Sequence, residues 1–243
     1  MAHQHSRFKH TVHIWQTTLA KRVRILRNDK PNLPALLGAR ICHDLISPVS
    51  AISNGMELLH LSGDLSGPEA ELIDESAQNA CARLKYFRLA FGQVGPDQWI
   101  SGLEMTDIAT RHFSTDSFRV QMDVPNEMSR LNAQMTLLLL LCCETLLSQR
   151  GTVSVRGAGN IECQGTLNTQ RQNLWTALLK NTDWPADLAA SDVHFALARE
   201  ALNTSGLQLR SKQQDQVLTL TIEPVMTGLQ LNREPSRPQR QGT

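Results

Sequence analysis

The sequence predicts an α+β protein in which an antiparallel helical hairpin precedes a mixed α/β region. Three observations carry this prediction. Residues 34–61 place apolar side chains along one face of a helix. Residues 68–91 repeat apolar side chains at alternating spacings of four and three. Beyond residue 101, short runs with the pattern of strands alternate with helical segments.

Length and composition suit two folded domains or one large domain. The 243 residues carry 24 Lys and Arg against 23 Asp and Glu, a formal net charge of +1, which argues against nucleic acid as the main partner. Five cysteines without framework spacing indicate reduced thiols in the cytosol. No apolar run approaches the ~18 residues that span a membrane, and the N-terminus lacks the apolar segment of a signal peptide. We therefore expect a cytoplasmic protein that binds neither nucleic acid nor membrane.

The two ends of the chain differ in composition from the rest. Residues 1–30 are basic and rich in histidine, but these histidines lack the spacing and the acidic or thiol partners of a metal site. We expect a basic, disordered tail there, or a start assigned too far upstream, and no bound metal. Residues 232–243 are polar and predict a second disordered tail.

His43 is the feature around which the first helix is organised. At about 100° per residue it falls almost opposite the centre of the apolar face, beside Ser47 and Ser50. We therefore expect its imidazole to stand in water. Asp44 follows directly, and Pro48, one turn later, removes a backbone hydrogen bond from the helix. The exposed ring, the adjacent carboxylate and the proline together distinguish His43 from an ordinary surface histidine.

The second helix predicts a dimer. Ser66 is its expected N-cap, Pro68 suits its first turn and Gly92 suits its C-terminal cap. One hairpin alone leaves apolar flanks exposed, so we expect two hairpins to pair as a dimeric four-helix bundle. Packing against the chain's own C-terminal half is the alternative. The apolar seam expected on the second helix consists of Ile73, Ala77, Ala80, Leu84, Phe87 and Phe91.

A linker at residues 95–101, opened by Gly95-Pro96, divides the predicted hairpin domain, residues 31–94, from the α/β domain, residues 102–231. The run LLLLLCC has no polar face and predicts a helix buried on nearly all sides. The elements expected after the linker are helices near 104–112, 132–148, 172–181 and 192–203, and strands near 117–124, 151–156, 160–166, from 207 and 216–222.

The segment ARICHDLISPVSAISNGMELL closely resembles the phosphoacceptor segment of the ChpT-type histidine phosphotransferases of alphaproteobacteria. Its H-D-L-x-x-P core also resembles the shorter pattern of sensor histidine kinases. The resemblance extends from about Ala35 to Glu223 and is strongest in the first helix. It implies that His43, with Asp44 beside it, carries a phosphoryl group. It also implies that the second domain is a degenerate, Bergerat-type relative of the histidine-kinase ATPase domain.

The nucleotide-binding features of such kinases are missing from the second domain. The helix that would supply a magnesium-binding Asn reads MTLLLLLCCETLLSQRG, with Glu144 near that position, and no D-x-G-x-G occurs. Gly157-Ala158-Gly159 between two strands is better explained by a β-turn than by a phosphate cradle. We expect no ATP-dependent kinase activity and no cofactor bound by this chain.

The resemblance then implies a phosphorelay. A phosphoryl group would pass from the phospho-aspartate of a CckA-like hybrid-kinase receiver domain, through His43, to the aspartate of CtrA-like and CpdR-like response regulators in cell-cycle regulation. Magnesium would be supplied by the partner receiver domain. That domain would be contacted by Ile46, Ser47 and Ser50. An atypical autophosphorylating kinase and a non-catalytic dimeric adaptor for receiver domains are the alternatives.

Three side chains near His43 have roles that the sequence leaves open. Asp44 either accepts a hydrogen bond from the imidazole or is simply solvated. Arg40, one turn before His43, and Lys85 on the second helix are candidates for contacts to phosphoryl oxygens. Either cation is equally explained as a surface charge that keeps the bundle soluble.

Overall fold

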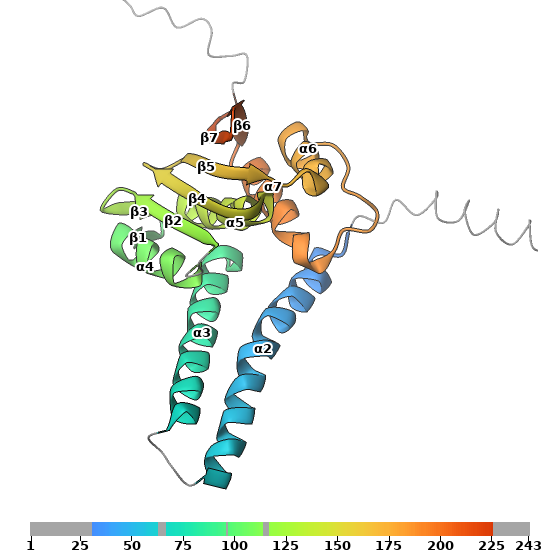
Figure 1. The fold of residues 1–243 in the computed structure, drawn as a ribbon. Helices are drawn as coiled ribbons and strands as arrows, with labels where there is room; N and C mark the ends of the chain where they lie inside the picture. Colours follow the sequence, from blue (N-terminus) through green and yellow to red (C-terminus); the bar gives the residue numbers. More distant parts are fainter. Residues whose placement is uncertain (1–30, 63–66, 96, 114–116, 226–243) are drawn as a thin grey trace, which may run out of the picture. The chain divides into compact units, whose positions relative to one another are not determined.

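The computed structural model of the chain describes residues 31–62, 67–95, 97–113 and 117–225. The two tails predicted at residues 1–30 and 232–243 therefore lie outside the described residues, as does Ser66, the predicted N-cap. Within the described residues the order is a helical hairpin followed by a sheet with packed helices (Figure 1). This order confirms the predicted α+β class.

The hairpin consists of α2 (Leu33–Ser62) and α3 (Pro68–Phe91). The α2 helix runs through Pro48 without ending. The two helices are in close contact at Gly55, where a Cβ would lie 2.6 Å from Cγ1 of Ile73. A larger residue there would displace the Ile73 side chain. The second helix starts at Pro68, and Gly92 is its C-cap, as predicted. Its N-cap is Gly67 rather than the predicted Ser66, so no N-cap side chain bonds to the helix.

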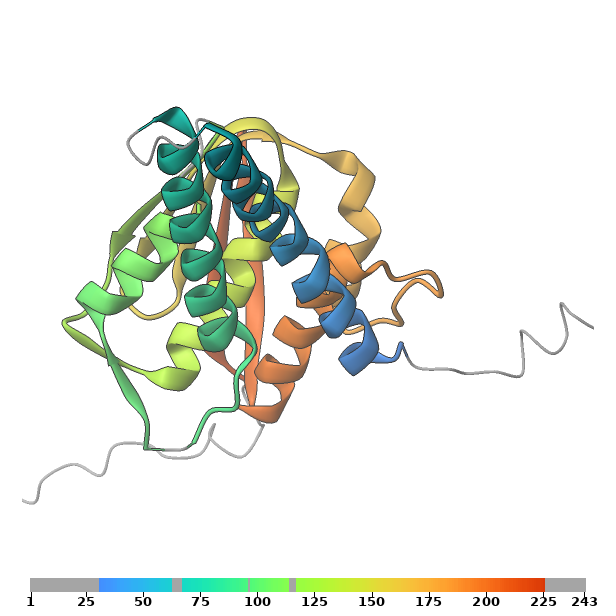
Figure 2. The same cartoon turned by 90° about the horizontal axis from the view of Figure 1, so that it is seen from below.

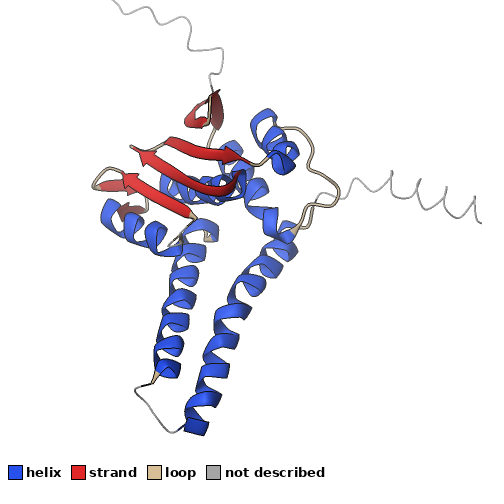
Figure 3. Ribbon diagram, viewed as in Figure 1, coloured by secondary structure: helices blue, strands red, loops and turns tan. Residues whose placement is uncertain are grey.

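The region after the hairpin combines a mixed sheet with helices on one of its faces (Figure 3). Within the described residues, five strands are hydrogen-bonded in the order β2-β4-β5-β7-β6, with β2 parallel to β4 and the other pairs antiparallel. The elements are β1 (Trp99–Ser101), α4 (Gly102–His112), β2 (Phe118–Asp123), β3 (Glu127–Ser129), α5 (Arg130–Leu146), β4 (Leu147–Arg156), β5 (Asn160–Leu167), η1 (Thr169–Arg171), α6 (Gln172–Lys180), η2 (Ala190–Asp192), α7 (Val193–Thr204), β6 (Leu207–Gln214) and β7 (Val217–Pro224).

Most of these elements match the predicted segments, but two strands were not predicted. The β1 and β3 strands pair with each other in antiparallel register, Ile100 opposite Met128. Each strand is three residues long, which is too short to show an alternating pattern. Ser101 at the end of β1 also caps α4, because its hydroxyl accepts a hydrogen bond from the Glu104 amide.

The α5 helix is the centre of the core, as its apolar run predicted. Leu137 to Cys143 are all buried, and the helix contacts α3, α7 and β4. From the sheet side, Val153, Val155 and Ile161 complete this core. A helix enclosed in this way cannot move without disturbing both the sheet and the hairpin.

The C-terminal end of α3 is fastened to α5 by side chains that satisfy its last carbonyl groups. Nη2 of Arg130 donates to the carbonyl of Leu89 at 3.0 Å, and Nε2 of Gln134 donates to the carbonyl of Gly92 at 2.8 Å. The hydroxyl of Tyr86, fully buried, donates to the carbonyl of Leu137 at 2.7 Å. The end of the hairpin therefore has a fixed position on the core.

The other helix of the hairpin is much less enclosed. Among the residues of α2 whose burial is described, Gly55 is buried and all others are exposed or partly buried. Figures 1 and 2 show the N-terminal half of α2 beside α7, which it contacts. On α3 the predicted seam is packed except at one position: Leu84 is 52% exposed. Its place in the seam of a dimeric bundle stays a prediction.

The segment from Leu33 to Leu59 is long and apolar enough to cross a membrane by length and composition. This corrects the expectation that no segment approaches that limit. The segment is weak evidence for a span, because it contains the ion pair of Arg40 and Asp44 and packs against α3 and α7.

Candidate functional site

His43 projects from α2 into the solvent, with 87% of its side chain exposed. Ile41, two residues earlier, lies on the opposite side of the helix and packs against the core. This arrangement agrees with the helical phase expected from the sequence. A protein partner can therefore reach the imidazole without any rearrangement of the described residues.

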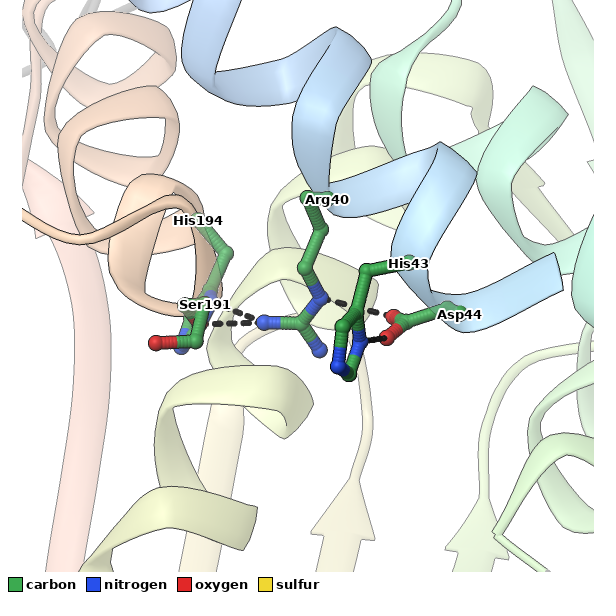
Figure 4. Close-up of polar contacts among 5 residues, drawn as sticks. All are labelled: Arg40, His43, Asp44, Ser191 and His194. Atoms are coloured by element: carbon green, nitrogen blue, oxygen red, sulfur yellow. Dashed lines mark hydrogen bonds and ion pairs between the residues drawn. The ribbon is translucent and has the colours of Figure 1, made fainter. Parts of the chain in front are cut away.

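Asp44 connects this exposed ring to a partly buried cation (Figure 4). Its Oδ1 lies 3.0 Å from Nδ1 of His43, and its Oδ2 accepts a hydrogen bond of 2.7 Å from Nε of Arg40. The two carboxylate oxygens thus have different partners. Of the two roles left open for Asp44, the structure shows the hydrogen bond to the imidazole.

The protonation of Asp44 determines the direction of that bond. Burial alone raises the pKa of Asp44, but the hydrogen bond from His43, the charge and hydrogen bond of Arg40, and the charge of Arg83 together outweigh it, so that the pKa falls below its ordinary value. The carboxylate is therefore ionised at neutral pH and can only accept. Nδ1 of His43 must be the donor, and in the neutral ring the lone pair lies on Nε2.

Arg40 contacts both Asp44 and the second domain. Its side chain is 13% exposed, and besides Asp44 its Nη1 donates to the carbonyl of Ser191 and approaches Nδ1 of His194 at 3.3 Å. Figure 4 shows the guanidinium between α2 and the start of α7. A contact between Arg40 and a phosphoryl group stays a prediction.

Known proteins resemble this chain in sequence and in structure. Residues 103–217 match the family model of the histidine phosphotransferase C-terminal domain. Over 88 residues, 36% of this chain, the sequence is 44% identical to the protein phosphotransferase ChpT of Brucella abortus. A solved structure titled as a bacterial phosphotransferase superposes with a TM-score of 0.65 at 25% identity, covering 79% of this chain and 96% of that one.

The chain is similar to ChpT-type phosphotransferases. The resemblance read from the segment around His43 is thereby confirmed. The aligned segment covers 40% of the length of the Brucella ChpT protein.

Arg83 on α3 is a second cation that acts on the site. Its charge lowers the pKa of Asp44, of His112 and of Glu144. Lys85 is exposed and follows Arg83 by two positions, about 200° around the helix. Its contact with the phosphoryl group stays a prediction.

The three residues predicted to contact a partner lie on the same exposed surface as His43. Ile46 is 63% exposed, and Ser47 and Ser50 are exposed as well. An isoleucine in this position offers apolar area beside the imidazole. The contact itself stays a prediction.

Two groups of the second domain lie in the electrostatic neighbourhood of Asp44, and no sequence motif indicated them. Burial raises the pKa of Glu144 on α5, and although many protein atoms surround it, the side chain still reaches the solvent. Burial, with the charges of Arg83 and Arg40, lowers the pKa of His112 on α4 to about 3. The His112 ring stacks on Tyr86 at 3.8 Å between centroids.

No cluster of three or more possible metal ligands occurs among the described residues of the protein.

The stacked His112 predicts a loss of stability in mild acid. The folded protein keeps this ring neutral, whereas the unfolded chain takes up a proton below pH ~6.5. The contribution of His112 to the free energy of unfolding is therefore full above pH ~6.5. It falls as the pH drops, by about 1.4 kcal/mol between pH 7.5 and 5.5. His112→Phe retains the stacking and removes the titration, so urea unfolding of this variant should show that much less pH dependence. Equal slopes for the wild type and His112→Phe would contradict the assignment.

Proposed function

We propose that this protein is a histidine phosphotransferase that relays a phosphoryl group through His43. The donor is the phospho-aspartate of a hybrid-kinase receiver domain, and the acceptor is the aspartate of a response regulator. The observation that carries the proposal is the pairing of an exposed imidazole with an ionised carboxylate on Nδ1, which leaves the Nε2 lone pair towards solvent. The match to the phosphotransferase domain model supports it.

The chemistry follows from that pairing. Nε2 attacks phosphorus in line, a bond from nitrogen to phosphorus forms, and the bond from phosphorus to the donor's carboxylate oxygen breaks. The donor aspartate leaves as a carboxylate, while the phosphorylated ring keeps its proton on Nδ1. Asp44 accepts a hydrogen bond from that proton and stabilises the positive charge that develops on the ring. Transfer to the second aspartate is the same step in reverse.

The proposed partners are those implied by the family resemblance: a CckA-like receiver domain as donor and CtrA-like and CpdR-like regulators as acceptors, in cell-cycle control. The receiver would bring the magnesium ion and dock over Ile46, Ser47 and Ser50, all of which are exposed around His43. We place the reaction in the cytoplasm, where such receivers act, with neither nucleic acid nor membrane as a partner.

The second domain, in this proposal, is an ATPase-like domain that has lost its nucleotide chemistry. Glu144 on α5, near the place where such kinases carry a magnesium-binding Asn, is instead part of the electrostatic environment of Asp44 and Arg40. The competing possibilities, an autophosphorylating kinase and a non-catalytic adaptor, are separated by the source and the fate of the phosphoryl group.

Replacing His43 with Gln should abolish transfer without unfolding the protein. An amide nitrogen has no available lone pair for attack, and the exposed position limits the change in unfolding free energy to about 0.5 kcal/mol. The measurement is the passage of labelled phosphate from a phosphorylated receiver domain to a second receiver. Glu57→Gln, an exposed change four turns further along α2, is the matched control and should leave transfer intact.

Three results would overturn the proposal. Labelling of the wild-type chain by ATP alone would identify a kinase, and receiver binding without any phosphate on the wild-type chain would identify an adaptor. A folded His43→Gln variant that still transfers phosphate would move the chemistry to another residue.

We also propose that the hairpin forms a homodimer as a four-helix bundle. Large apolar side chains at least 44% exposed accumulate along α2 and α3, which is unusual for a surface that stays in water. A second copy of the hairpin would cover them with the same residues, as two-fold symmetry requires. These side chains are Val49, Met56, Leu58, Leu72 and Leu84; Ile46, beside His43, is left for the receiver contact.

Leu84→Asp should therefore dissociate the dimer, because it places an unpaired charge in the buried interface. Sedimentation at low micromolar concentration should give twice the chain mass for wild type and the single mass for the variant. Leu103→Asp is the control, because Leu103 is 85% exposed on α4, outside the hairpin, and its substitution should leave the dimer intact. A monomeric wild-type protein would remove the dimer proposal.

A further inference from the structure

Arg40 joins the helix that carries His43 to the second domain. On one side, its Nε donates to Oδ2 of Asp44 at 2.7 Å. On the other side, its Nη1 donates to the carbonyl of Ser191 in η2 and lies 3.3 Å from Nδ1 of His194 in α7. Arg40 thus bonds to a residue 151 positions further along the chain (Figure 4).

The partners on the second domain are fixed groups. His194 is fully buried, and its burial, with the charges of Arg40 and Arg171, lowers its pKa well below the ordinary value, so the ring is neutral. A guanidinium can only donate hydrogen bonds, so Nδ1 of His194 accepts and its proton lies on Nε2. Arg171 forms an ion pair with Asp192, the last residue of η2, and this pair holds the junction of η2 and α7 in place.

Asp44 depends on this connection. The carboxylate is 14% exposed and would be costly to bury as an anion without a cation. Arg40 supplies that cation on Oδ2, which leaves Oδ1 for Nδ1 of His43. Arg83 and Glu144, the other charged groups that act on this site, are not hydrogen-bonded to the carboxylate in the described structure.

We propose that Arg40 is a positioning residue through which Ser191 and His194 of the second domain hold the Asp44–His43 pair in its reactive form. This rests on the proposed phosphotransfer at His43 and adds a role for the second domain in it. Arg40 does not touch the phosphoryl group. It orients Asp44, and Asp44 retains the proton on Nδ1 of His43 so that Nε2 is the nucleophile.

The alternative is that Arg40 only fastens the hairpin to the second domain. The two roles differ in their effect on the His43 ring. A fastening contact leaves the tautomer of an exposed histidine unchanged. A positioning contact does not, because free imidazole side chains favour the proton on Nε2 rather than on Nδ1.

The test uses the full-length chain labelled with ¹⁵N-histidine. Long-range ¹H–¹⁵N NMR identifies which nitrogen of His43 carries the proton, and a second assay follows phosphate uptake by His43 from the small donor phosphoramidate, without any receiver domain. Wild type should show the proton on Nδ1. Arg40→Met should shift it to Nε2 and slow phosphate uptake by about 10- to 100-fold.

The His194 variants keep the test decisive if Arg40→Met fails to fold. His194→Asn retains an acceptor near the position of Nδ1 and should keep the wild-type tautomer of His43. His194→Leu should lose that tautomer. Arg111→Met is the matched control, because Arg111 forms the same i,i+4 bond to Asp107, also 2.7 Å, on the exposed surface of α4. It should change neither the tautomer nor the uptake.

A folded Arg40→Met or His194→Leu protein with the proton still on Nδ1 and an unchanged rate would overturn the positioning role. That result would leave the proposed function standing if His43 remained essential for receiver-to-receiver transfer. Conversely, a wild-type chain that never takes phosphate from a receiver would refute the function, while the NMR measurement would still decide whether Arg40 positions the ring.

Discussion

The hydrogen bond between Nδ1 of His43 and Oδ1 of Asp44 is the interaction on which the chemistry of this site depends. It joins a side chain that is almost entirely in water to one that is almost entirely out of it. The donor in this bond is fixed as Nδ1 only while the carboxylate is ionised. A carboxylate with little exposure stays ionised only beside a cation. The reactivity of the exposed ring is therefore controlled from within the protein by Arg40.

The fold explains how that control is possible. The end of α3 is fastened to α5 through Arg130, Gln134 and Tyr86, and α5 is enclosed by the sheet and α7. The N-terminal half of α2 then lies against η2 and α7, so that Arg40 reaches Ser191 and His194. Farther along, α2 has little cover from the rest of the described chain, which leaves apolar surface for another molecule.

The sequence predicted the parts of this structure that depend on local periodicity. The two long helices, the buried α5 and the exposed face of His43 all follow from the spacing of apolar residues, which repeats over several turns. The β1 and β3 strands did not follow, because three residues cannot display a pattern. The apolar character of α2 was underestimated because Arg40 and Asp44 interrupt its apolar residues, although the mean hydropathy of the segment is high.

Contacts between segments far apart in the chain could not be predicted from the sequence. Arg40 was assigned to the phosphoryl group because it precedes His43 by almost one turn, but its guanidinium is directed to residues 151 or more positions away. Arg83 was not predicted to act on the site, because the rotation of α3 relative to α2 is set by tertiary packing, which a single sequence does not show. Glu144 and His112 belong to elements that meet the hairpin only after folding.

The most direct measurement of the central claim is the position of the phosphoryl group on the histidine ring. The full-length protein would be phosphorylated by a phospho-receiver domain, and ³¹P–¹H correlation NMR would identify the nitrogen bonded to phosphorus. Because Asp44 occupies Nδ1, the account predicts phosphorus on Nε2 of His43. Phosphorus on Nδ1 of His43, or on a residue other than His43, would contradict it.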